Sequence, residues 1–292
     1  MIFILILYKI KEKLIEKNFG EKMVSKKEKI KKESLENKVL YNLCNDYLNE
    51  MTGKKESSFE RKKEILSAQI FLIGRSYSAS PERRNTANKN IKFSGNGYDS
   101  FFGALSEEML RNEKFDNLFS ELSNLDGYGF ENKDDDIRIL KKSIVSVFTL
   151  NKIVKDSINT IDGIICEDEG RNQISFCSKF LHFYFPEIFF IYDSISCDKA
   201  KKFKINNKSI KYDKNYYNEI IKKIRENEKY KFALKQEKDV NALKKYTIHC
   251  LNEYEIAYKY ASEYFDEFIT RRVDYILMSG ENKFCKKRTF IE

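Results

Sequence analysis

The residues best suited to chemistry lie in the stretch 170–196, GRNQISFCSKFLHFYFPEIFFIYDSIS. Its first half has helical spacing, with an apolar face formed by Ile174, Cys177, Phe180, Leu181 and Tyr184. The other face carries Ser175, Ser178, Lys179 and His182 at positions i, i+3, i+4 and i+7. Lys179 therefore lies on a helix that we expect to be mostly buried.

The same stretch ends in one acid, Asp193, after an apolar crossover interrupted by Pro186 and before an expected helix from Ser194. The helix N-terminus favours the ionised form of such a carboxyl, while apolar surroundings raise its pKa. An anionic Asp193 can stabilise an oxocarbenium ion, or position a water or an amine to attack C1′ of a nucleotide. The alternatives are that Asp193 only caps the next helix, that Lys179 extends to solvent, and that His182 is a surface or hydrogen-bonded core histidine.

A second group of candidates lies between residues 75 and 99. Hydroxyls, an aromatic ring and arginines can line a base pocket or clamp phosphates, and here they are Arg75, Ser76, Tyr77, Ser78, Ser80, Glu82, Arg83 and Arg84. The alternative is a helix terminus whose arginines pair with neighbouring acids. The loop SGNGYD permits close backbone approach and Tyr98 can stack on a base, although a plain turn fits equally well. A structural ion-pair network is the better interpretation of Arg271, Arg272 and Asp274.

The elements that must position these residues are expected to be helices, because the chain has 2 prolines and 11 glycines in 292 residues. The apolar spacing predicts helices over 38–52, 60–73, 105–124 (one or a pair), 137–160, 174–185, from 194, 216–234 and 240–276. We expect loops at 125–136, 162–170 and 199–215. Residues 1–36 are expected to form a basic leader, as a solvated helix or loose tail, before one domain over 37–292.

Composition restricts the class of function. The net charge of +9 favours a polyanionic partner, although lysine-rich codon usage and the +4 of residues 1–36 weaken that signal. Six cysteines without a CxxC pair and two histidines argue against a zinc site, so we expect neither metal nor organic cofactor. The apolar start MIFILILY is too short to span a bilayer, so we expect a cytoplasmic protein without membrane contact.

A helical hairpin, a short helix and an apolar crossover ending in Asp193 before another helix resemble the helix-hairpin-helix DNA glycosylase superfamily. The segments FLIGRSYSASPERR, SKFLHFYFPEIFFIYDS and TRRVDYILMSG resemble its divergent bacterial branch with an 8-oxoguanine-glycosylase-like domain, over roughly residues 60–280. The resemblance implies an all-α, two-lobed fold with a helix-hairpin-helix-type element. It also implies that Asp193 is the essential acid, and that a lysine of the preceding helix forms a Schiff base with the sugar in bifunctional members.

Two departures from the superfamily leave the mechanism open. The hairpin turn that donates backbone amides to a phosphate is replaced by EDEGRNQ, with only Gly170. The superfamily places its lysine, or a serine in its stead, roughly eighteen positions before the acid, and Ser175 occupies that position. An ungapped register predicts a monofunctional enzyme that uses Asp193 and water, and a gapped one predicts a lyase that uses Lys179. We favour Lys179 because it is the only lysine on this helix.

These observations predict a DNA glycosylase that cleaves the N-glycosidic bond of a flipped-out modified or damaged base, in base excision repair or antiviral defence. The expected catalytic residues are Asp193 and Lys179. The expected contacts to substrate or DNA are Arg75, Tyr77, Ser78, Arg83, Tyr98, Gly170, Ser175 and His182. The main alternative is a non-catalytic nucleic-acid-binding module on the same fold, and a helical protein–protein adaptor is a third. No obligate protein partner is evident.

Overall fold

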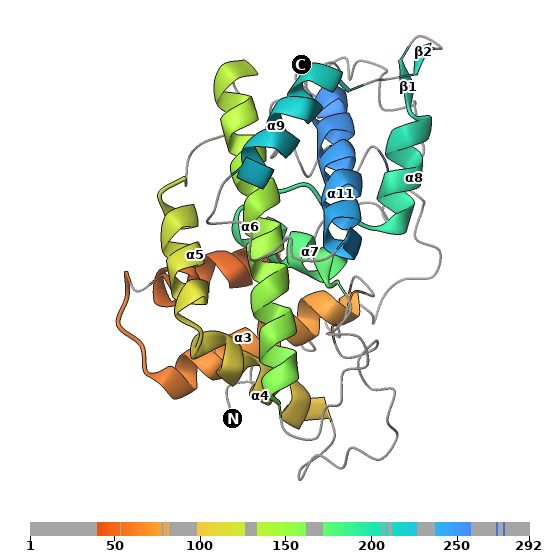
Figure 1. Cartoon of the computed structure of the whole chain (residues 1–292). Helices are drawn as coiled ribbons and strands as arrows, with labels where there is room; N and C mark the ends of the chain where they lie inside the picture. Colours follow the sequence, from red (N-terminus) through yellow and green to blue (C-terminus); the bar gives the residue numbers. More distant parts are fainter. Residues whose placement is uncertain are drawn as a thin grey trace, which may run out of the picture. The chain divides into compact units, whose positions relative to one another are not determined.

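The computed structural model describes residues 40–52, 54–76, 79, 81, 98–125, 133–161, 172–205, 208–209, 212–226, 237–257, 273 and 277. The regular structure of these residues is helical, apart from one antiparallel ladder of two-residue strands, β1 (Lys204–Ile205) and β2 (Lys208–Ser209). The predicted all-α fold class is confirmed (Figure 1). The predicted leader, 1–36, lies outside the described residues.

The chain divides into two compact units. Unit 1 comprises residues 1–120 and 157–165, and unit 2 comprises residues 121–156 and 166–292. The described part of unit 1 holds helical residues 40–51, α3 (Phe59–Ser76), α4 (Tyr98–Leu110) and most of α5 (Glu113–Ser123). The described part of unit 2 holds most of α6 (Lys133–Thr160), then α7 (Ile174–Tyr184), α8 (Ser194–Lys202), the β1–β2 ladder, α9 (Lys214–Glu226) and α11 (Glu237–Ile256).

Unit 1 is built on the packing of α3 against α4. The rings of Phe71 and Phe102 meet edge to face with centroids 5.4 Å apart, and Lys63 donates a hydrogen bond of 2.6 Å to Glu107 across the same pair of helices. Apolar side chains of both helices are buried here because their helical spacing gives each one an apolar face.

A buried carboxylate joins helical residues 40–51 to the start of α3. Glu50 is 1% exposed and accepts hydrogen bonds from Arg61 Nε (2.7 Å), Arg61 Nη2 (3.0 Å), Lys55 (2.9 Å) and Ser57 (2.9 Å). The hydrogen bonds from Arg61 lower the pKa of Glu50 to about 2, against the opposing effect of burial, with further lowering by Lys55 and Ser57.

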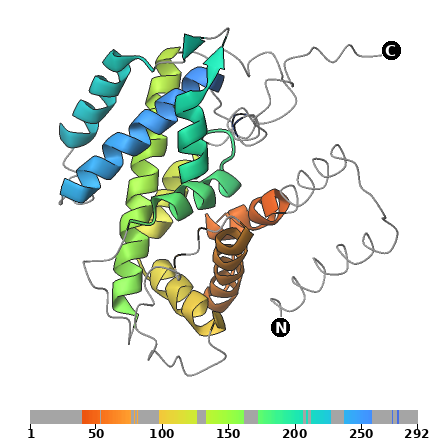
Figure 2. The same ribbon diagram turned by 90° about the vertical axis from the view of Figure 1, so that its right-hand side faces the viewer.

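Unit 2 carries the predicted chemical residues. Helix α11 packs against both α8 and α9, and Figures 1 and 2 show it alongside them. On α6, Phe148 lies with its ring centroid 6.1 Å from that of Tyr246, and Asp136 accepts a 2.6 Å hydrogen bond from the hydroxyl of Tyr254. Both tyrosines belong to α11, so α6 and α11 are held together by buried aromatic packing and by a buried hydrogen bond.

Most predicted helices are present, with some ends displaced. The predicted loop 125–136 is wrong for 133–136, where α6 already begins, since three consecutive acids suit a helix N-terminus. The predicted loop 199–215 is wrong for 199–202, which form the last turn of α8, for β1 and β2, and for 214–215, where α9 begins. Lysines are favourable in a last helical turn. The stretch 105–124 belongs to a pair of helices, and the side chain of Asn112 accepts from the amide of Lys114 at the start of α5. Helix α3 continues two residues past a buried Gly74.

Candidate functional site: a buried lysine and the aspartate that begins α8

Helix α7 is fixed at its start by a side chain from α6. The Oδ1 of Asn151 accepts a 2.6 Å hydrogen bond from the amide of Gln173, and its Nδ2 donates to Oδ1 of Asn172 at 3.2 Å. All α7 residues except Ser175 are buried, so its polar face is enclosed by protein as well as its apolar one. The helix ends at Tyr184, one residue before the predicted end at 185 and two residues before Pro186, which cannot continue a helix.

A side chain of α7 holds the crossover that follows this helix. The Nδ1–H of His182 donates a 2.6 Å hydrogen bond to the carbonyl of Phe189, and His182 is 0% exposed. This agrees with the hydrogen-bonded core histidine among the interpretations given above. The crossover residues Phe189, Phe190 and Ile191 are buried, so the backbone reaches Asp193 through the core.

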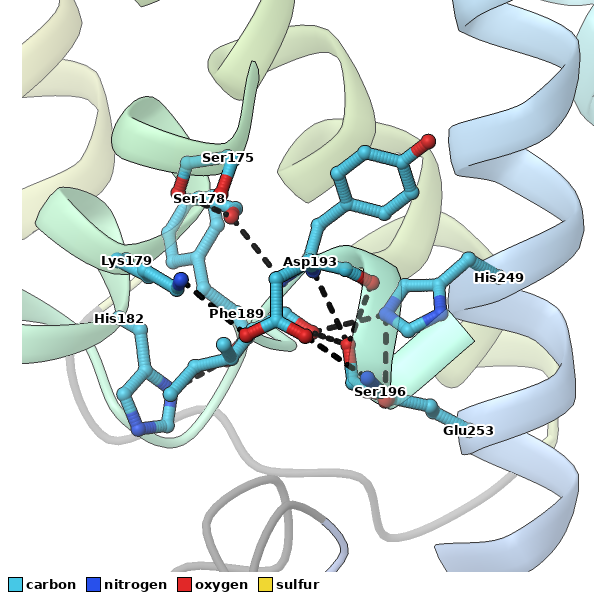
Figure 3. A network of polar contacts seen from close by, with 11 residues as sticks. Ser175, Ser178, Lys179, His182, Phe189, Asp193, Ser196, His249 and Glu253 are labelled. Carbon is cyan, nitrogen blue, oxygen red and sulfur yellow. Dashed lines mark hydrogen bonds and ion pairs between the residues drawn. The ribbon is translucent and has the colours of Figure 1, made fainter. Parts of the chain in front are cut away.

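Three helices fix the backbone immediately before Asp193 (Figure 3). The amide of Tyr192 donates to the hydroxyl of Ser178 on α7 at 3.1 Å. The carbonyl of Ile191 accepts from Nε2 of His249 on α11 at 2.9 Å and from the hydroxyl of Ser196 on α8 at 3.3 Å. Side chains from α7, α8 and α11 therefore fix the position of the backbone from which the side chain of Asp193 extends.

Asp193 is the N-cap of α8. Its Oδ1 accepts a 2.8 Å hydrogen bond from the amide of Ser196, and the hydroxyl of Ser196 accepts from the amide of Asp193 at 3.0 Å. This reciprocal arrangement is a capping box, which satisfies two backbone donors at the helix start. The predicted start of α8 at Ser194 is confirmed, and so is the capping role named as an alternative for Asp193.

The second carboxylate oxygen of Asp193 pairs with the predicted lysine. Oδ2 lies 3.2 Å from Nζ of Lys179, as Figure 3 shows. The side chain of Lys179 is 3% exposed and that of Asp193 is 23% exposed, so Lys179 does not extend to solvent. Burial raises the pKa of Asp193, but the amide of Ser196 and the ammonium of Lys179 lower it more, and the net pKa is lowered.

A buried histidine of α11 contacts the crossover from the other side. The Nε2 of His249 that contacts Ile191 also lies 3.2 Å from Oε1 of Glu253. The rings of Tyr192 and Tyr246 pack against His249, with centroids 5.1 Å and 6.4 Å away. Burial lowers the pKa of His249 to about 4, so the imidazole is neutral at physiological pH. Its Nδ1 has no hydrogen-bond partner among the described residues, which fits the unprotonated nitrogen of a neutral ring.

Of the predicted site residues, Lys179 and Asp193 are brought into contact. Ser175, the other candidate for the lysine position, is partly exposed and its carbonyl accepts from Ser178 at 3.2 Å. The predicted residues Tyr77, Ser78, Arg83 and Gly170 lie outside the described residues, as do Arg271, Arg272 and Asp274.

Two more predicted residues lie in unit 1. Arg75 is in the last turn of α3, with its guanidinium carbon 5.7 Å from the ring centroid of Phe71. Tyr98 is the first residue of α4, so the predicted loop SGNGYD is wrong for its last two residues. The roles predicted for both in contacting DNA stay predictions.

Sequence reasoning did not assign Ser196, His249 or Glu253 to the site. Ser196 could have been found, because Asp193 and Ser196 are spaced as an N-cap and its N3 residue. The spacing of His249, 58 residues beyond the carbonyl that it contacts, carries no local signal.

Neither a metal centre nor a membrane segment is found in the described part of the chain. Its histidine, cysteine and carboxylate side chains form no group of three or more suited to a metal ion. None of its helices combines the length and the apolar composition needed to cross a membrane. No protein-family model, curated protein or solved structure matches this chain.

Proposed function

We propose that this protein is a DNA N-glycosylase that excises a flipped-out modified or damaged base, with Lys179 and Asp193 as its catalytic residues. The observation that carries the proposal is the contact of 3.2 Å between a buried amine and a partly exposed carboxylate at a helix N-terminus. The resemblance to the helix-hairpin-helix glycosylases supports it, because it selects the same acid, and its gapped register selects the same lysine.

The pair suits chemistry at a glycosidic carbon. The transition state for loss of a base has oxocarbenium character, and a fixed anion beside C1′ stabilises the positive charge that develops there. Asp193 provides such an anion, because its lowered pKa keeps it ionised and the capping box fixes its orientation. The exposed part of the pair is the carboxylate, so a nucleotide reaches Asp193 first.

In the lyase form of the mechanism, Lys179 is the nucleophile. The resting ion pair holds the amine as an ammonium ion, so it must lose a proton before it attacks. The bound nucleotide separates the pair, and Asp193 or the leaving base accepts that proton. Nζ then forms a bond to C1′, the bond between C1′ and the base nitrogen breaks, and its electron pair leaves with the base. In the monofunctional form, Asp193 directs a water molecule to C1′ instead.

The test is base excision under single-turnover conditions, with borohydride to trap a covalent adduct. Duplexes carry oxidised, deaminated, alkylated, hydroxymethylated or glucosylated bases. We expect wild-type protein to produce abasic sites and Asp193→Asn to reduce the rate by about 100-fold or more, the scale of general acid–base catalysis. A trapped adduct that disappears in Lys179→Gln identifies the lyase form, and excision without trapping identifies the water-dependent form.

A second buried Lys–Asp pair in unit 2 provides the matched control. Nζ of Lys155 on α6 lies 3.8 Å from Oδ1 of Asp239 on α11, and the two side chains are 8% and 9% exposed. The variants Lys155→Gln and Asp239→Asn disturb a buried pair of the same kind without touching the proposed site, so they are expected to retain excision. Equal losses in both sets of variants would refute the catalytic assignment and indicate loss of folding alone.

The same assay addresses the non-catalytic alternative. A binding module on this fold binds DNA with strong salt dependence and yields no abasic site with any duplex of the panel. In such a module, Asp193→Asn changes only the stability of the protein. Salt-dependent DNA binding without any abasic site would therefore refute the proposed glycosylase activity.

A further inference from the structure

The chain has two histidines, and both hold the same short stretch of backbone. Residues 189–193 belong to neither a helix nor a strand, so their buried carbonyls need hydrogen-bond donors from other elements. The Nδ1–H of His182 on α7 donates to the carbonyl of Phe189 at 2.6 Å. The Nε2–H of His249 on α11 donates to the carbonyl of Ile191 at 2.9 Å (Figure 3). The two rings therefore tie the crossover to two different helices.

Both imidazole rings are fixed in the core. His182 and His249 are buried, and the rings of Tyr192 and Tyr246 lie against His249 with centroids 5.1 Å and 6.4 Å away. An imidazole has only two side-chain torsions, and close packing restricts both of them. Each donating N–H therefore has a defined position, and so has the carbonyl that it holds.

The polar face of α7 sets the amine and the carboxylate relative to each other. The hydroxyl of Ser178 accepts from the amide of Tyr192, and Lys179 pairs with Asp193. On the same helix, His182 holds the carbonyl four residues before Asp193. A donor that only satisfied a buried carbonyl could come from any element. Here it comes from the helix that carries the amine, so one helix holds both the amine and the backbone that leads to the carboxylate.

We propose that His182 and His249 are positioning residues of the candidate site. By holding the crossover, they keep the carboxylate of Asp193 at the distance from the amine of Lys179 that the reaction requires. They act through the backbone of residues 189–191. The catalytic part of this inference rests on the proposed function, whereas the geometric part, that the histidines hold the ion pair together, does not.

Each histidine has one substitution that keeps its donor and one that removes it. The side-chain N–H of asparagine is attached at Cγ, like Nδ1 of histidine, and that of glutamine lies one bond further out, as Nε2 does. The amide variants His182→Asn and His249→Gln therefore keep a donor, and the leucine variants His182→Leu and His249→Leu have none. The control is Tyr254→Phe, which removes from α11 a buried hydrogen bond of 2.6 Å to Asp136 that does not involve the crossover.

The first measurement is the rate at which Lys179 is methylated by formaldehyde and cyanoborohydride, followed by peptide mass spectrometry. Loss of one hydrogen bond to a buried carbonyl shifts a local opening equilibrium by about tenfold. We therefore expect Lys179 to be methylated about tenfold faster in each leucine variant, and at the wild-type rate in the amide variants and in Tyr254→Phe. Lys155, which is buried in the other Lys–Asp pair of unit 2, is the internal reference and should not change.

The second measurement is the single-turnover rate of base excision, together with DNA affinity. Displacement of a reacting group by about 1 Å can reduce a rate by about 100-fold. We expect the leucine variants to lose about 10- to 100-fold in rate, and the amide variants to restore most of it. DNA affinity should stay within about twofold of the wild type, because the histidines affect the reacting geometry and not the binding of the strand.

The outcomes separate this proposal from the proposed function. Leucine and amide variants that behave alike would overturn the positioning role, and so would equal acceleration of methylation at Lys155 or in Tyr254→Phe. Faster methylation of Lys179 with an unchanged excision rate would overturn the catalytic part and leave the glycosylase. A wild type that excises no base refutes the glycosylase and the catalytic part with it. In that case, faster methylation of Lys179 in the leucine variants alone would support the geometric part.

Discussion

Protonation of His249 should destabilise the fold over a defined range of pH. The imidazole is 3% exposed, and burial lowers its pKa from 6.5 to about 4. In the unfolded chain the same side chain has its ordinary pKa near 6.5. The unfolded state therefore binds a proton between pH 6.5 and pH 4 while the folded state does not. Stability must fall as the pH falls through this range, and His249 adds no further change below pH 4.

The magnitude follows from the size of the shift. Each pKa unit corresponds to about 1.4 kcal/mol, so a depression from 6.5 to about 4 corresponds to about 3 kcal/mol of unfolding free energy. The charged groups near the ring act in both directions, since Asp193 raises this pKa and Lys201 lowers it. The carboxyl group of Glu253 and the rings of Tyr192 and Tyr246 face the same imidazole.

The assay is urea unfolding at intervals between pH 7 and pH 4, for the wild type and for His249→Gln. Glutamine can still donate its Nε2–H to the carbonyl of Ile191 and does not titrate. The carboxylates of the protein titrate in both proteins, so the difference between the two curves isolates His249. We expect this difference to shift by about 3 kcal/mol in favour of the variant as the pH is lowered from 7 to 4.

Parallel curves for the two proteins would show that His249 has the same pKa folded and unfolded, and the reasoning from burial would be refuted. A shift of opposite sign would mean that Glu253 stabilises the imidazolium form. Glu253→Gln separates these outcomes, because it should leave the pH dependence of His249 intact if burial is the main cause.

Two further predictions concern carboxylates that are held in ion pairs. Asp193→Asn keeps a good N-cap but removes the carboxylate charge that faces the buried ammonium of Lys179. It should therefore lower the unfolding free energy in urea by about 2–3 kcal/mol, and Lys179→Met/Asp193→Asn should recover more than half of this loss. If the double variant instead loses the sum of the two single-variant losses in unfolding free energy, the two residues are not coupled and the prediction is wrong. Glu50→Gln should lower the unfolding free energy by about 2 kcal/mol at pH 7. This is less than the full pKa shift implies, because the side chain of its partner Arg61 is 40% exposed and solvent screens the pair. Because the pKa of Glu50 is lowered from 4.5 to about 2, the difference from wild type should vanish as the pH falls from 4.5 to 2, and a constant difference would contradict it.

Local sequence signals predicted the elements around the site well. Pro186 cannot continue a helix, which gives the end of α7, and an aspartate followed by Ser-Ile-Ser gives the start of α8. The contact of Lys179 with Asp193 was within reach because Asp193 lies at the second boundary and Lys179 lies on the helix that ends at the first. The errors at 133–136 and 199–202 arose from interpreting runs of like charge as loops, although such runs also suit helix ends.

Other parts of the site could not be predicted from local patterns. Ser178 was recognised as polar, but its role in accepting the amide of Tyr192 depends on how the crossover returns across α7. His249 contacts a backbone carbonyl, and any residue can supply a carbonyl, so no residue type marks the partner. Contacts of side chains with distant backbone become visible only once the fold is known.

The depth of Lys179 has a consequence for chemical selectivity. Cells contain free aldehydes and reducing sugars, which condense with accessible, unprotonated amines. A side chain that is 3% exposed and paired with a carboxylate at 3.2 Å is shielded from such small carbonyl compounds on both counts. In the proposed mechanism, only a ligand that binds well enough to open the ion pair can react with this amine. The contact that holds the resting site together thus also restricts which molecules the amine can react with.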